Sequence, residues 1–368
     1  MILPTVSADL QLIRQGHPLI DVRAPVEFAK GALPGAVNLP LMEDEERRRV
    51  GIAYKEQGQQ AAIALGNELV SGAVKEARMA AWRDYLTRHP EAVIYCFRGG
   101  LRSQIVQQWL AESGVVRPRI EGGWKALRQR LLVHIDVAAQ QPLLVVGGLT
   151  GCAKTVLINR LANGVDLEGF AKHKGSAFGR SPEPPPCQID FEHWLSKRLL
   201  ELPGPLVVED ESRQIGEVNV PLSFWGAMER APRLRVEMPL DWRLEQLRRD
   251  YILDLEHAYQ LRYGPEEGWQ RMCQQLSNAL LRLKKRLGNA RLQRLQRLQA
   301  LAFTAHEQGN TQAHEAWLAP LLTEYYDPMY RYHLERQRDA FVPEYHVGDW
   351  ESCLAAARQW SLDQATAR

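Results

Sequence analysis

A glycine-rich loop near the middle of the chain constrains the fold more than any other feature. Residues 147–155 read Gly-Gly-Leu-Thr-Gly-Cys-Ala-Lys-Thr, follow the apolar run 143–146 and precede a helical pattern. Backbone N–H groups of such a loop, together with its lysine, hold phosphate oxygens, and the threonine can hold Mg²⁺. A strand, this loop and a helix in that order therefore predict a phosphate site in a parallel α/β domain.

The residues of this loop that we assign to phosphate binding are Gly148, Thr150, Gly151, Lys154 and Thr155. Ala153 departs from the usual pattern, because it stands where the last glycine is expected. Glu209 and Asp210 end the apolar run 206–208 and are candidate acidic residues for Mg²⁺. The alternative is a glycine-rich turn beside an ordinary strand, and the phosphates could belong to a nucleotide or to another diphosphate.

A second loop carries a cysteine at the end of a predicted strand. Cys96 follows the apolar run 92–95 and is followed by Phe-Arg-Gly-Gly-Leu-Arg-Ser, where a helix begins. Inward-pointing N–H groups, the helix dipole and two arginines favour a thiolate nucleophile beside an oxyanion pocket. A buried structural cysteine is the alternative. The residues that we assign to the oxyanion loop around Cys96 are Arg98, Gly99, Gly100, Arg102 and Ser103.

The length of this loop separates two chemistries. Cys96 and Arg102 have the C-x5-R spacing of tyrosine and dual-specificity phosphatases. The loop is one residue longer than the commonest sulfurtransferase loop, so it has room for a tetrahedral oxyanion of phosphate size. A phosphatase would also need a general acid for the leaving group, and the sequence identifies none.

The residues around Cys96 resemble those of rhodanese domains. The resemblance is carried by Leu-Ile-Asp-Val-Arg at 19–23, Gly-Ala-Leu-Pro-Gly-Ala-Val-Asn at 31–38 and Ile-Glu-Gly-Gly-Trp at 120–124. It covers about residues 5–135 and implies that Cys96 occupies the persulfide-forming position. Ala32 departs from many rhodaneses, which carry histidine there.

A basic, leucine-rich segment lies in the C-terminal third of the chain. No acidic residue occurs between positions 282 and 297, and leucines recur at spacings of three and four. A helix with this pattern could lay its charges along nucleic-acid phosphates, although a solvated face is equally expected. The candidate nucleic-acid-binding residues are Arg282, Lys284, Lys285, Arg286, Arg291 and Arg294.

The composition excludes several classes of protein. The chain has 368 residues, 45% hydrophobic and 24% charged, so disorder as its main state is excluded. A net charge of +2 means that any nucleic-acid surface must come from local clustering. We expect a cytoplasmic protein without a membrane partner, because neither a signal peptide nor an apolar run of ~18 residues is visible. Five scattered cysteines argue against a disulfide framework or zinc site, and we assign no metal-ligand residues beyond the two acids.

The whole chain resembles one family, the bacterial tRNA 2-selenouridine synthases. The specific marks are the Cys96 loop, the glycine-rich loop, Asp-Leu-Glu-Gly at 166–169, Gly-Ser-Ala-Phe-Gly at 175–179 and residues 208–216. The resemblance implies an enzyme that replaces the sulfur of wobble 2-thiouridine with selenium. Geranyl diphosphate first alkylates the sulfur, and selenium from selenophosphate then displaces the geranylthio group.

The resemblance also divides the work between the two loops. It implies that Cys96 carries selenium as a selenylsulfide and that the loop around Lys154 holds the diphosphate of the geranyl donor. The co-substrates are then selenophosphate and geranyl diphosphate, with no tightly bound cofactor and with Mg²⁺ left open. The expected partner is a tRNA anticodon arm, a selenophosphate-producing enzyme is a candidate second partner, and we expect a monomer.

The expected fold class is α/β, with two parallel-sheet regions and a helical end. We expect a rhodanese-like domain over residues 1–138 and a P-loop NTPase-like α/β domain over 139–240. Residues 241–368 are expected to form a mostly helical, partly basic region packed on the P-loop domain. Three alternatives remain: a sulfurtransferase acting on tRNA or a small acceptor, a C-x5-R phosphatase, and a non-enzymatic nucleotide-sensing adaptor.

Overall fold

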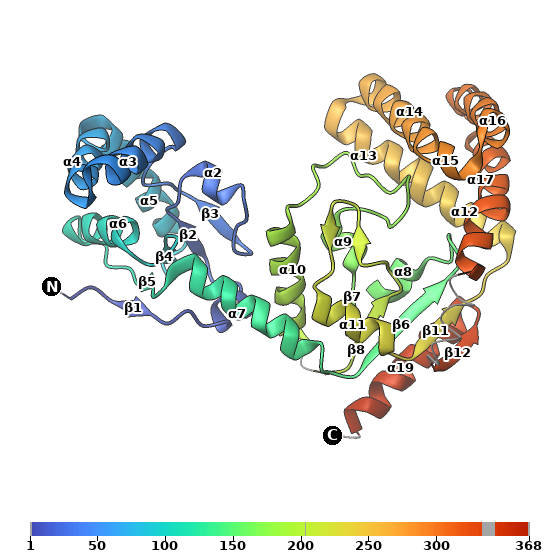
Figure 1. Ribbon diagram of the computed structural model, residues 1–368, viewed down its shortest axis with the longest axis horizontal. Helices are drawn as coiled ribbons and strands as arrows, with labels where there is room; N and C mark the ends of the chain where they lie inside the picture. The colour runs from blue at the N-terminus through green and yellow to red at the C-terminus, as the bar shows by residue number, and fades with distance from the viewer. Residues whose placement is uncertain (1, 203, 333–342, 367–368) are drawn as a thin grey trace. The chain divides into compact units, whose positions relative to one another are not determined.

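The computed structural model describes residues 2–202, 204–332 and 343–366. The chain forms two compact units (Figure 1). The first unit joins Met1–Ile135 to Cys187–Glu201, and the second joins Asp136–Pro186 to Leu202–Arg368. Each unit has its own parallel sheet with helices around it, which confirms the predicted α/β fold class.

The first unit is built on a sheet with the strand order β1-β5-β4-β2-β3. Its strands are β1 (Thr5–Val6), β2 (Leu19–Asp21), β3 (Ala36–Asn38), β4 (Val93–Tyr95) and β5 (Arg119–Ile120). Every neighbouring pair is parallel. The central strands β2 and β4 are buried at every residue, as expected for a parallel sheet covered on both faces. The one charged residue among them, Asp21 at the end of β2, is paired with Arg23.

Helices cover this sheet, and three of them form the long connection between two of its strands. They are α1 (Gln11–Arg14), α2 (Pro25–Phe28), α3 (Asp44–Gln57), α4 (Gln59–Leu69), α5 (Gly72–Arg88), α6 (Leu101–Glu112) and α7 (Gly123–Ala138). The connection from β3 to β4 holds α3, α4 and α5. Helices α4 and α5 are separate, because Ser71 is extended and Gly72 has a φ of +48°.

One helix reaches the first unit from far along the chain. Helix α10 (Gln188–Glu201) follows the proline-rich loop, in the region that the sequence analysis treated as one domain over 139–240. Its Ser196 hydroxyl donates to the Leu131 carbonyl oxygen at 2.9 Å, and its Asp190 carboxylate accepts the Ala32 N–H at 2.9 Å. These polar contacts, and the packing of Ile189 and Leu200 against the core of the first unit, attach α10 to that unit.

The second unit has a sheet with the strand order β12-β11-β6-β8-β7. Its strands are β6 (Leu143–Gly148), β7 (Gly164–Val165), β8 (Leu206–Glu209), β11 (Arg233–Val236) and β12 (Glu344–Gly348), all parallel to their neighbours. The glycine-rich loop leaves the central strand β6, and Val146 of β6 pairs with Glu209 of β8. This register brings the end of β8 beside the start of the loop.

The rest of the second unit is mostly helical, as predicted for the C-terminal third. Beside the sheet lie α8 (Lys154–Asn159), α9 (Leu167–Ala171), the hairpin β9 (Gln214–Ile215) and β10 (Val218–Asn219), α11 (Leu222–Arg230) and α19 (Trp350–Thr366). The helical part contains α12 (Leu240–Arg248), α13 (Asp254–Tyr263), α14 (Pro265–Arg282), α15 (Lys284–Leu287), α16 (Asn289–Glu307) and α17 (Glu315–Leu321). These last helices lie together in Figure 1 and share a core that includes Met272, Leu276, Leu280 and Trp317.

Across the described parts of the chain, no helix combines the length and apolar character needed to cross a membrane. All five cysteines are free thiols.

Candidate functional site

Cys96 directly follows β4 and lies at the base of a loop that opens α6. It is buried, and its Sγ lies 3.2 Å from the Ser103 hydroxyl oxygen and 3.8 Å from the Gly100 carbonyl oxygen. The Ser103 hydroxyl also lies 3.0 Å from the Gly100 carbonyl oxygen. The predicted loop residues Gly100 and Ser103 therefore surround the sulfur.

Two glycines from different segments allow this loop to close. Gly99 has a φ of +65°, and a Cβ there would lie 2.7 Å from the Ile120 carbonyl oxygen. Gly123 has a φ of +56°, and a Cβ there would overlap the Cys96 carbonyl oxygen. That oxygen accepts the Trp124 N–H at 2.9 Å. The glycine pair of the rhodanese-like segment 120–124 is thus the surface against which the Cys96 loop packs.

The two arginines of the loop have different surroundings. Arg102 forms an ion pair with Glu27, whose carboxylate also lies 3.5 Å from Arg47. Burial alone would raise the pKa of Glu27, but Arg102 and Arg47 hold it below its usual value. Arg98 is exposed, with its guanidinium 5.7 Å from the centre of the Phe97 ring.

A third arginine supports the loop and was not singled out from the sequence. The Arg119 side chain donates to the Gly99 carbonyl oxygen at 2.7 Å. Its position next to the Ile-Glu-Gly-Gly-Trp segment was the available signal, because that segment already marked the neighbourhood of the loop.

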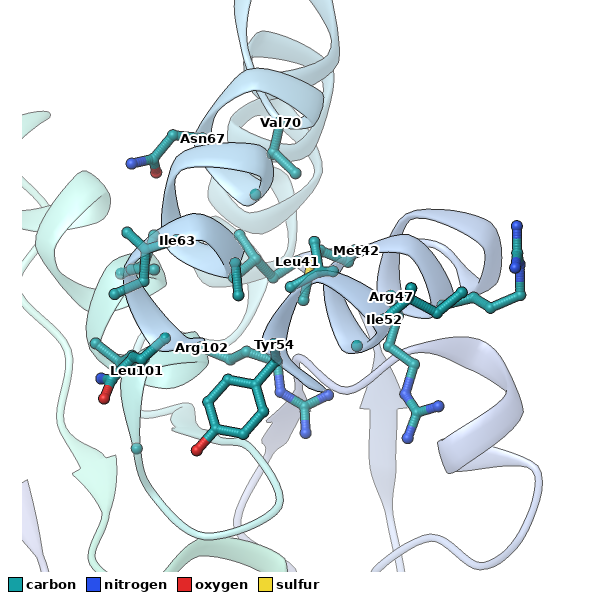
Figure 2. A pocket seen from close by; sticks show the side chains of 18 of the residues that line it. Leu41, Met42, Arg47, Ile52, Tyr54, Ile63, Asn67, Val70, Leu101 and Arg102 are labelled. Carbon is teal, nitrogen blue, oxygen red and sulfur yellow. The ribbon is translucent and has the colours of Figure 1, made fainter. Parts of the chain in front are cut away.

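A pocket of about 950 Å³ opens beside the Cys96 loop. It lies between α3, α4 and the start of α6 and includes Arg98, Gly100 and Arg102 in its wall (Figure 2). We call it the α3–α4 pocket. Its principal apolar residues are Leu41, Ile52, Ile63, Val70, Leu101 and Trp109.

The glycine-rich loop has the strand–loop–helix geometry predicted for phosphate binding. Gly148 and Gly151 have φ values of +150° and +87°. Ala153, which replaces the usual glycine, adopts the left-handed conformation with φ 52° and ψ 42°. An alanine there costs roughly 1 kcal/mol relative to glycine. Its carbonyl oxygen accepts a hydrogen bond from the Trp350 indole at 3.2 Å.

Protein groups occupy the loop's hydrogen-bonding positions in this structure. The Gly148 N–H donates to the Tyr330 hydroxyl at 2.6 Å, and the Lys154 ammonium donates to the Gly148 carbonyl oxygen at 3.1 Å. Burial by itself would lower the pKa of Lys154, but Tyr330, Glu211 and Glu168 raise it above its ordinary value. The ammonium is therefore charged and ready to hold a phosphate oxygen.

Carboxyl groups gather around Thr155, the last residue of the loop motif. Its hydroxyl lies 2.9 Å from Glu168 and 2.8 Å from Glu209. Burial, followed by the negative charge of Glu168, raises the pKa of Glu209 well above its usual value. The same two causes raise the pKa of Glu211 to about 8. The Thr155 hydroxyl has one proton, so it donates to one of these two carboxyl groups, Glu168 or Glu209, at a time.

The two predicted acidic residues have different partners. Glu209 is at the loop, whereas Asp210 accepts a hydrogen bond from Arg233 at 2.6 Å. Within residues 2–202, 204–332 and 343–366, no group of three histidine, cysteine or acidic residues is arranged to hold a metal ion. Glu168 was quoted in the sequence analysis only as part of a family segment, although it contacts Thr155 directly.

A pocket of about 510 Å³ surrounds the glycine-rich loop. We call it the phosphate-loop pocket. One part of its wall is polar and contains Thr150, Gly151, Lys154 and Thr155. The lining also contains apolar and aromatic residues, Phe178, Leu247, Tyr251, Leu255, Tyr326 and Met329. Five carboxyl groups complete it: Asp166, Glu168, Glu211, Asp250 and Asp254.

The predicted tRNA-binding residues are all exposed, on α14, α15 and α16. Arg282 donates to the Ala177 carbonyl oxygen at 2.7 Å, and Arg286 donates to the Tyr325 hydroxyl at 2.9 Å. Arg291 and Arg294 both pair with Glu324. Lys284 and Lys285 form no ion pair within the described part of the chain.

Two family models match the chain. The model described as the tRNA 2-selenouridine synthase AAA domain matches residues 141–364, and the rhodanese-like domain model matches residues 8–130. Each match covers one of the two loops described above.

Three full-length relatives are similar over nearly the whole chain. The tRNA 2-selenouridine synthase of Chromohalobacter salexigens is 64% identical over 98% of this chain and 99% of its own length. The proteins of the same name from Photobacterium profundum and Serratia proteamaculans are 45% and 48% identical. They cover 96% and 90% of this chain, and 100% and 91% of their own lengths.

Proposed function

The chain belongs to the tRNA 2-selenouridine synthase family, and from that premise we propose how its two loops share the reaction. The family match confirms the resemblance stated from the sequence, and the chain is an enzyme of tRNA modification. Geranylation of the 2-thiouridine sulfur takes place at the phosphate loop. Exchange of the alkylated sulfur for selenium takes place at the Cys96 loop.

The phosphate-loop pocket suits a prenyl diphosphate better than a nucleotide. The observation that supports this is that the apolar residues Phe178, Leu255 and Met329 line the same pocket as the phosphate-binding residues. The diphosphate would accept hydrogen bonds from loop N–H groups and Lys154, while the geranyl chain lies against these apolar residues. Mg²⁺, if used, would find oxygen donors in Thr155 and Glu209, the ligand type that it prefers.

The first step then needs a good leaving group rather than a strong base. The thiocarbonyl sulfur attacks the first carbon of the geranyl chain, and the bond between that carbon and the diphosphate oxygen breaks. The nucleobase loses its N3 proton to solvent. Loop N–H groups and the Lys154 ammonium stabilise the negative charge that develops on diphosphate, which is the largest contribution that such a site can make.

We place the second step at the Cys96 sulfur, in the loop whose length leaves room for an oxyanion of phosphate size. The Cys96 sulfur attacks the phosphorus of selenophosphate, the phosphorus–selenium bond breaks, and the departing selenide takes the proton of the thiol. The hydroselenide then adds to the carbon that carries the thioether and gives its proton to N3 of the base. Geranylthiolate leaves, and water hydrolyses the phosphate ester of Cys96. Selenium has the same oxidation level in selenophosphate and in the product, so no oxidant is needed. Cys96 is the nucleophilic side chain of this step, and the loop with Arg98 receives the selenophosphate.

The substrate is a tRNA, and we assign its anticodon arm to the basic helices of the second unit. The exposed Lys284 and Lys285 are the candidate residues best able to bind phosphates. All four candidate arginines already form hydrogen bonds or ion pairs with neighbouring protein groups. We further propose a cytoplasmic monomer that receives selenophosphate from the enzyme that makes it.

Mass spectrometry of nucleosides tests the proposal. An anticodon stem-loop RNA containing 2-thiouridine is incubated with the protein, with geranyl diphosphate or ATP, and with or without selenophosphate. We expect the S-geranyl nucleoside with geranyl diphosphate alone, 2-selenouridine with both co-substrates, and no product with ATP. Selenouridine formed without geranyl diphosphate would favour direct, sulfurtransferase-type exchange instead.

A further inference from the structure

We propose that the α3–α4 pocket binds the geranyl chain of the S-geranylated tRNA during the selenium step. This inference rests on the proposed function and names a substrate-binding site for its second step. The pocket belongs to the rhodanese-like unit, whereas the free geranyl diphosphate is bound by the phosphate-loop pocket of the other unit. The occupant is therefore the prenylated nucleoside and not the diphosphate.

The first argument is position. Arg98, Gly100 and Arg102 of the Cys96 loop line the α3–α4 pocket, so the pocket and the loop share a wall. A thioether carbon held at the loop would have its sulfur substituent directed along this wall. The chain that must leave in the second step would thus lie beside the reacting carbon.

The second argument is the apolar surface. Leu41 and Val70 are buried at the floor of the pocket, while Ile52 and Ile63 are 40% and 37% exposed at its sides. Figure 2 shows Leu41, Ile63 and Leu101 around one space, from three separate segments. Exposed aliphatic side chains that line a common pocket mark a binding site rather than the scattered apolar residues of an ordinary surface. A volume of about 950 Å³ is within the range of small-molecule pockets.

The third argument is charge. The pocket lining contains five cationic residues and no carboxylate: Arg47, Arg48, Lys55, Arg98 and Arg102. Glu27 and Glu45, outside the lining, pair with three of them. Lys55 and Arg98 form no ion pair in the described parts of the chain. An apolar cavity with a cationic rim fits an apolar chain that is attached to a polyanion, which is the chemistry of a prenylated RNA.

This binding has a direct chemical consequence. As selenium adds to the carbon, the carbon–sulfur bond breaks and the electron pair leaves with the geranylthiolate, which takes a proton from solvent. Hydrophobic contacts that hold the chain position the reacting carbon at the loop. A short S-alkyl group would lack these contacts.

The test separates the pocket from the rest of the reaction. The variant Ile52→Ser/Ile63→Ser changes two partly exposed residues of α3 and α4, and neither residue belongs to the Cys96 loop or the glycine-rich loop. Val74→Ser is the matched control, because Val74 is also 40% exposed on a helix of the same connection and does not line the pocket. Thermal unfolding checks that both variants are folded.

The substrates are anticodon stem-loop RNAs carrying S-geranyl-2-thiouridine or S-methyl-2-thiouridine, each supplied with selenophosphate. For the double variant we expect KM and Kd for the S-geranyl RNA to rise roughly tenfold or more, as for lost methylene contacts in an apolar pocket. Its KM for the S-methyl RNA, and its geranylation of 2-thiouridine RNA, should match the Val74→Ser control.

Two other outcomes are distinguishable. If wild type converts the S-geranyl RNA and the double variant has unchanged KM and Kd, this inference is overturned and the pocket has another occupant, such as a selenium-delivering protein. If wild type fails to convert the S-geranyl RNA at all, the proposed function falls, and this inference falls with it.

Discussion

Gly99 is the residue on which the shape of the Cys96 loop depends most directly. Its φ of +65° and its closeness to the Ile120 carbonyl oxygen leave no room for a side chain. Gly100, the next residue, has a φ of −94° and no atom within 4 Å of a Cβ placed there. The sequence predicted that both glycines shape the loop, but only the packing against residues 120–123 distinguishes them.

Replacing these two glycines by alanine should therefore give unequal losses of stability. We expect Gly99→Ala to lower the free energy of unfolding by roughly 2 kcal/mol or more, from the left-handed backbone and the overlap together. Gly100→Ala should change it by less than about 1 kcal/mol. Chemical denaturation of both variants is the measurement, and equal losses would contradict this account of the loop.

At the glycine-rich loop, the conformation around Ala153 could be predicted from the sequence, but the contacts of the loop with distant residues could not. The motif predicted the loop despite this departure, and the structure retains the loop by placing Ala153 in the left-handed conformation. The sequence could not reveal that Tyr330, far along the chain, contacts the Gly148 N–H. Such contacts depend on tertiary packing, which leaves no local pattern.

At the scale of elements, α10 is held in the first unit by a histidine that must stay neutral. The His193 Nδ1 atom donates to the Ala32 carbonyl oxygen at 2.6 Å, and its Nε2 atom accepts from Arg128 at 3.2 Å. Burial, and then the charges of Arg128 and Arg23, lower its pKa to about 4, although the bond to Ala32 opposes them. Below pH 6.5 the unfolded chain takes up a proton that the folded chain refuses.

His193 should therefore make the protein lose stability as pH falls from about 6.5 to 4, with full stability above that window. The complete loss from this one group is about 3 kcal/mol. In His193→Gln, which does not titrate, the decline in stability between pH 7 and 5 should be smaller than in wild type. Calorimetry at pH 7, 6 and 5 measures this, with exposed His257→Gln as the control. Identical pH profiles for wild type and His193→Gln would refute the assignment.

A buried ion pair connects α12 with the segment after the π-helical turn η3 (Leu322–Tyr326). The Arg243 guanidinium makes two hydrogen bonds to Asp327, at 2.8 and 2.7 Å, and both side chains are buried. Arg243 also donates to the Thr150 carbonyl oxygen of the phosphate loop at 3.2 Å. The pair thus links the helical part of the second unit to its phosphate site.

Loss of Asp327 should be costly, because it leaves the Arg243 charge buried without a partner. We expect Asp327→Ala to reduce the free energy of unfolding by about 3–5 kcal/mol and to raise KM for geranyl diphosphate. Asp84→Ala removes an exposed ion pair with Arg88 and should cost about 0–1 kcal/mol. Denaturant titration of the two variants compares them, and similar losses would show that burial does not decide the cost.

Helices and strands were predicted correctly where the segment itself has an apolar run or a regular spacing of leucines. The strands β4, β6 and β8 were all predicted from short apolar runs, and α14 to α16 from leucine spacing. Strand β12 was not, because its residues pair only with β11, more than a hundred positions away.

At the scale of the whole molecule, the sequence predicted two parallel sheets with one reactive loop on each. It could not predict that residues 187–201 return to the first unit, because the α10 contacts are long-range in sequence. Nor could it predict the α3–α4 pocket, which residues from three separate segments line together. Motifs identify chemistry, whereas pockets depend on the packing of distant segments.

The central claim is that the two loops carry different steps, and two variants test it most directly. Cys96→Ser and Lys154→Ala are each given 2-thiouridine RNA or S-geranyl-2-thiouridine RNA with both co-substrates, and the nucleosides are analysed by mass spectrometry. We predict that Cys96→Ser accumulates the S-geranyl nucleoside and forms no 2-selenouridine. Lys154→Ala should leave 2-thiouridine unchanged and still convert the S-geranyl RNA to 2-selenouridine. Formation of 2-selenouridine by Cys96→Ser, or failure of Lys154→Ala on the S-geranyl RNA, would contradict the division of work.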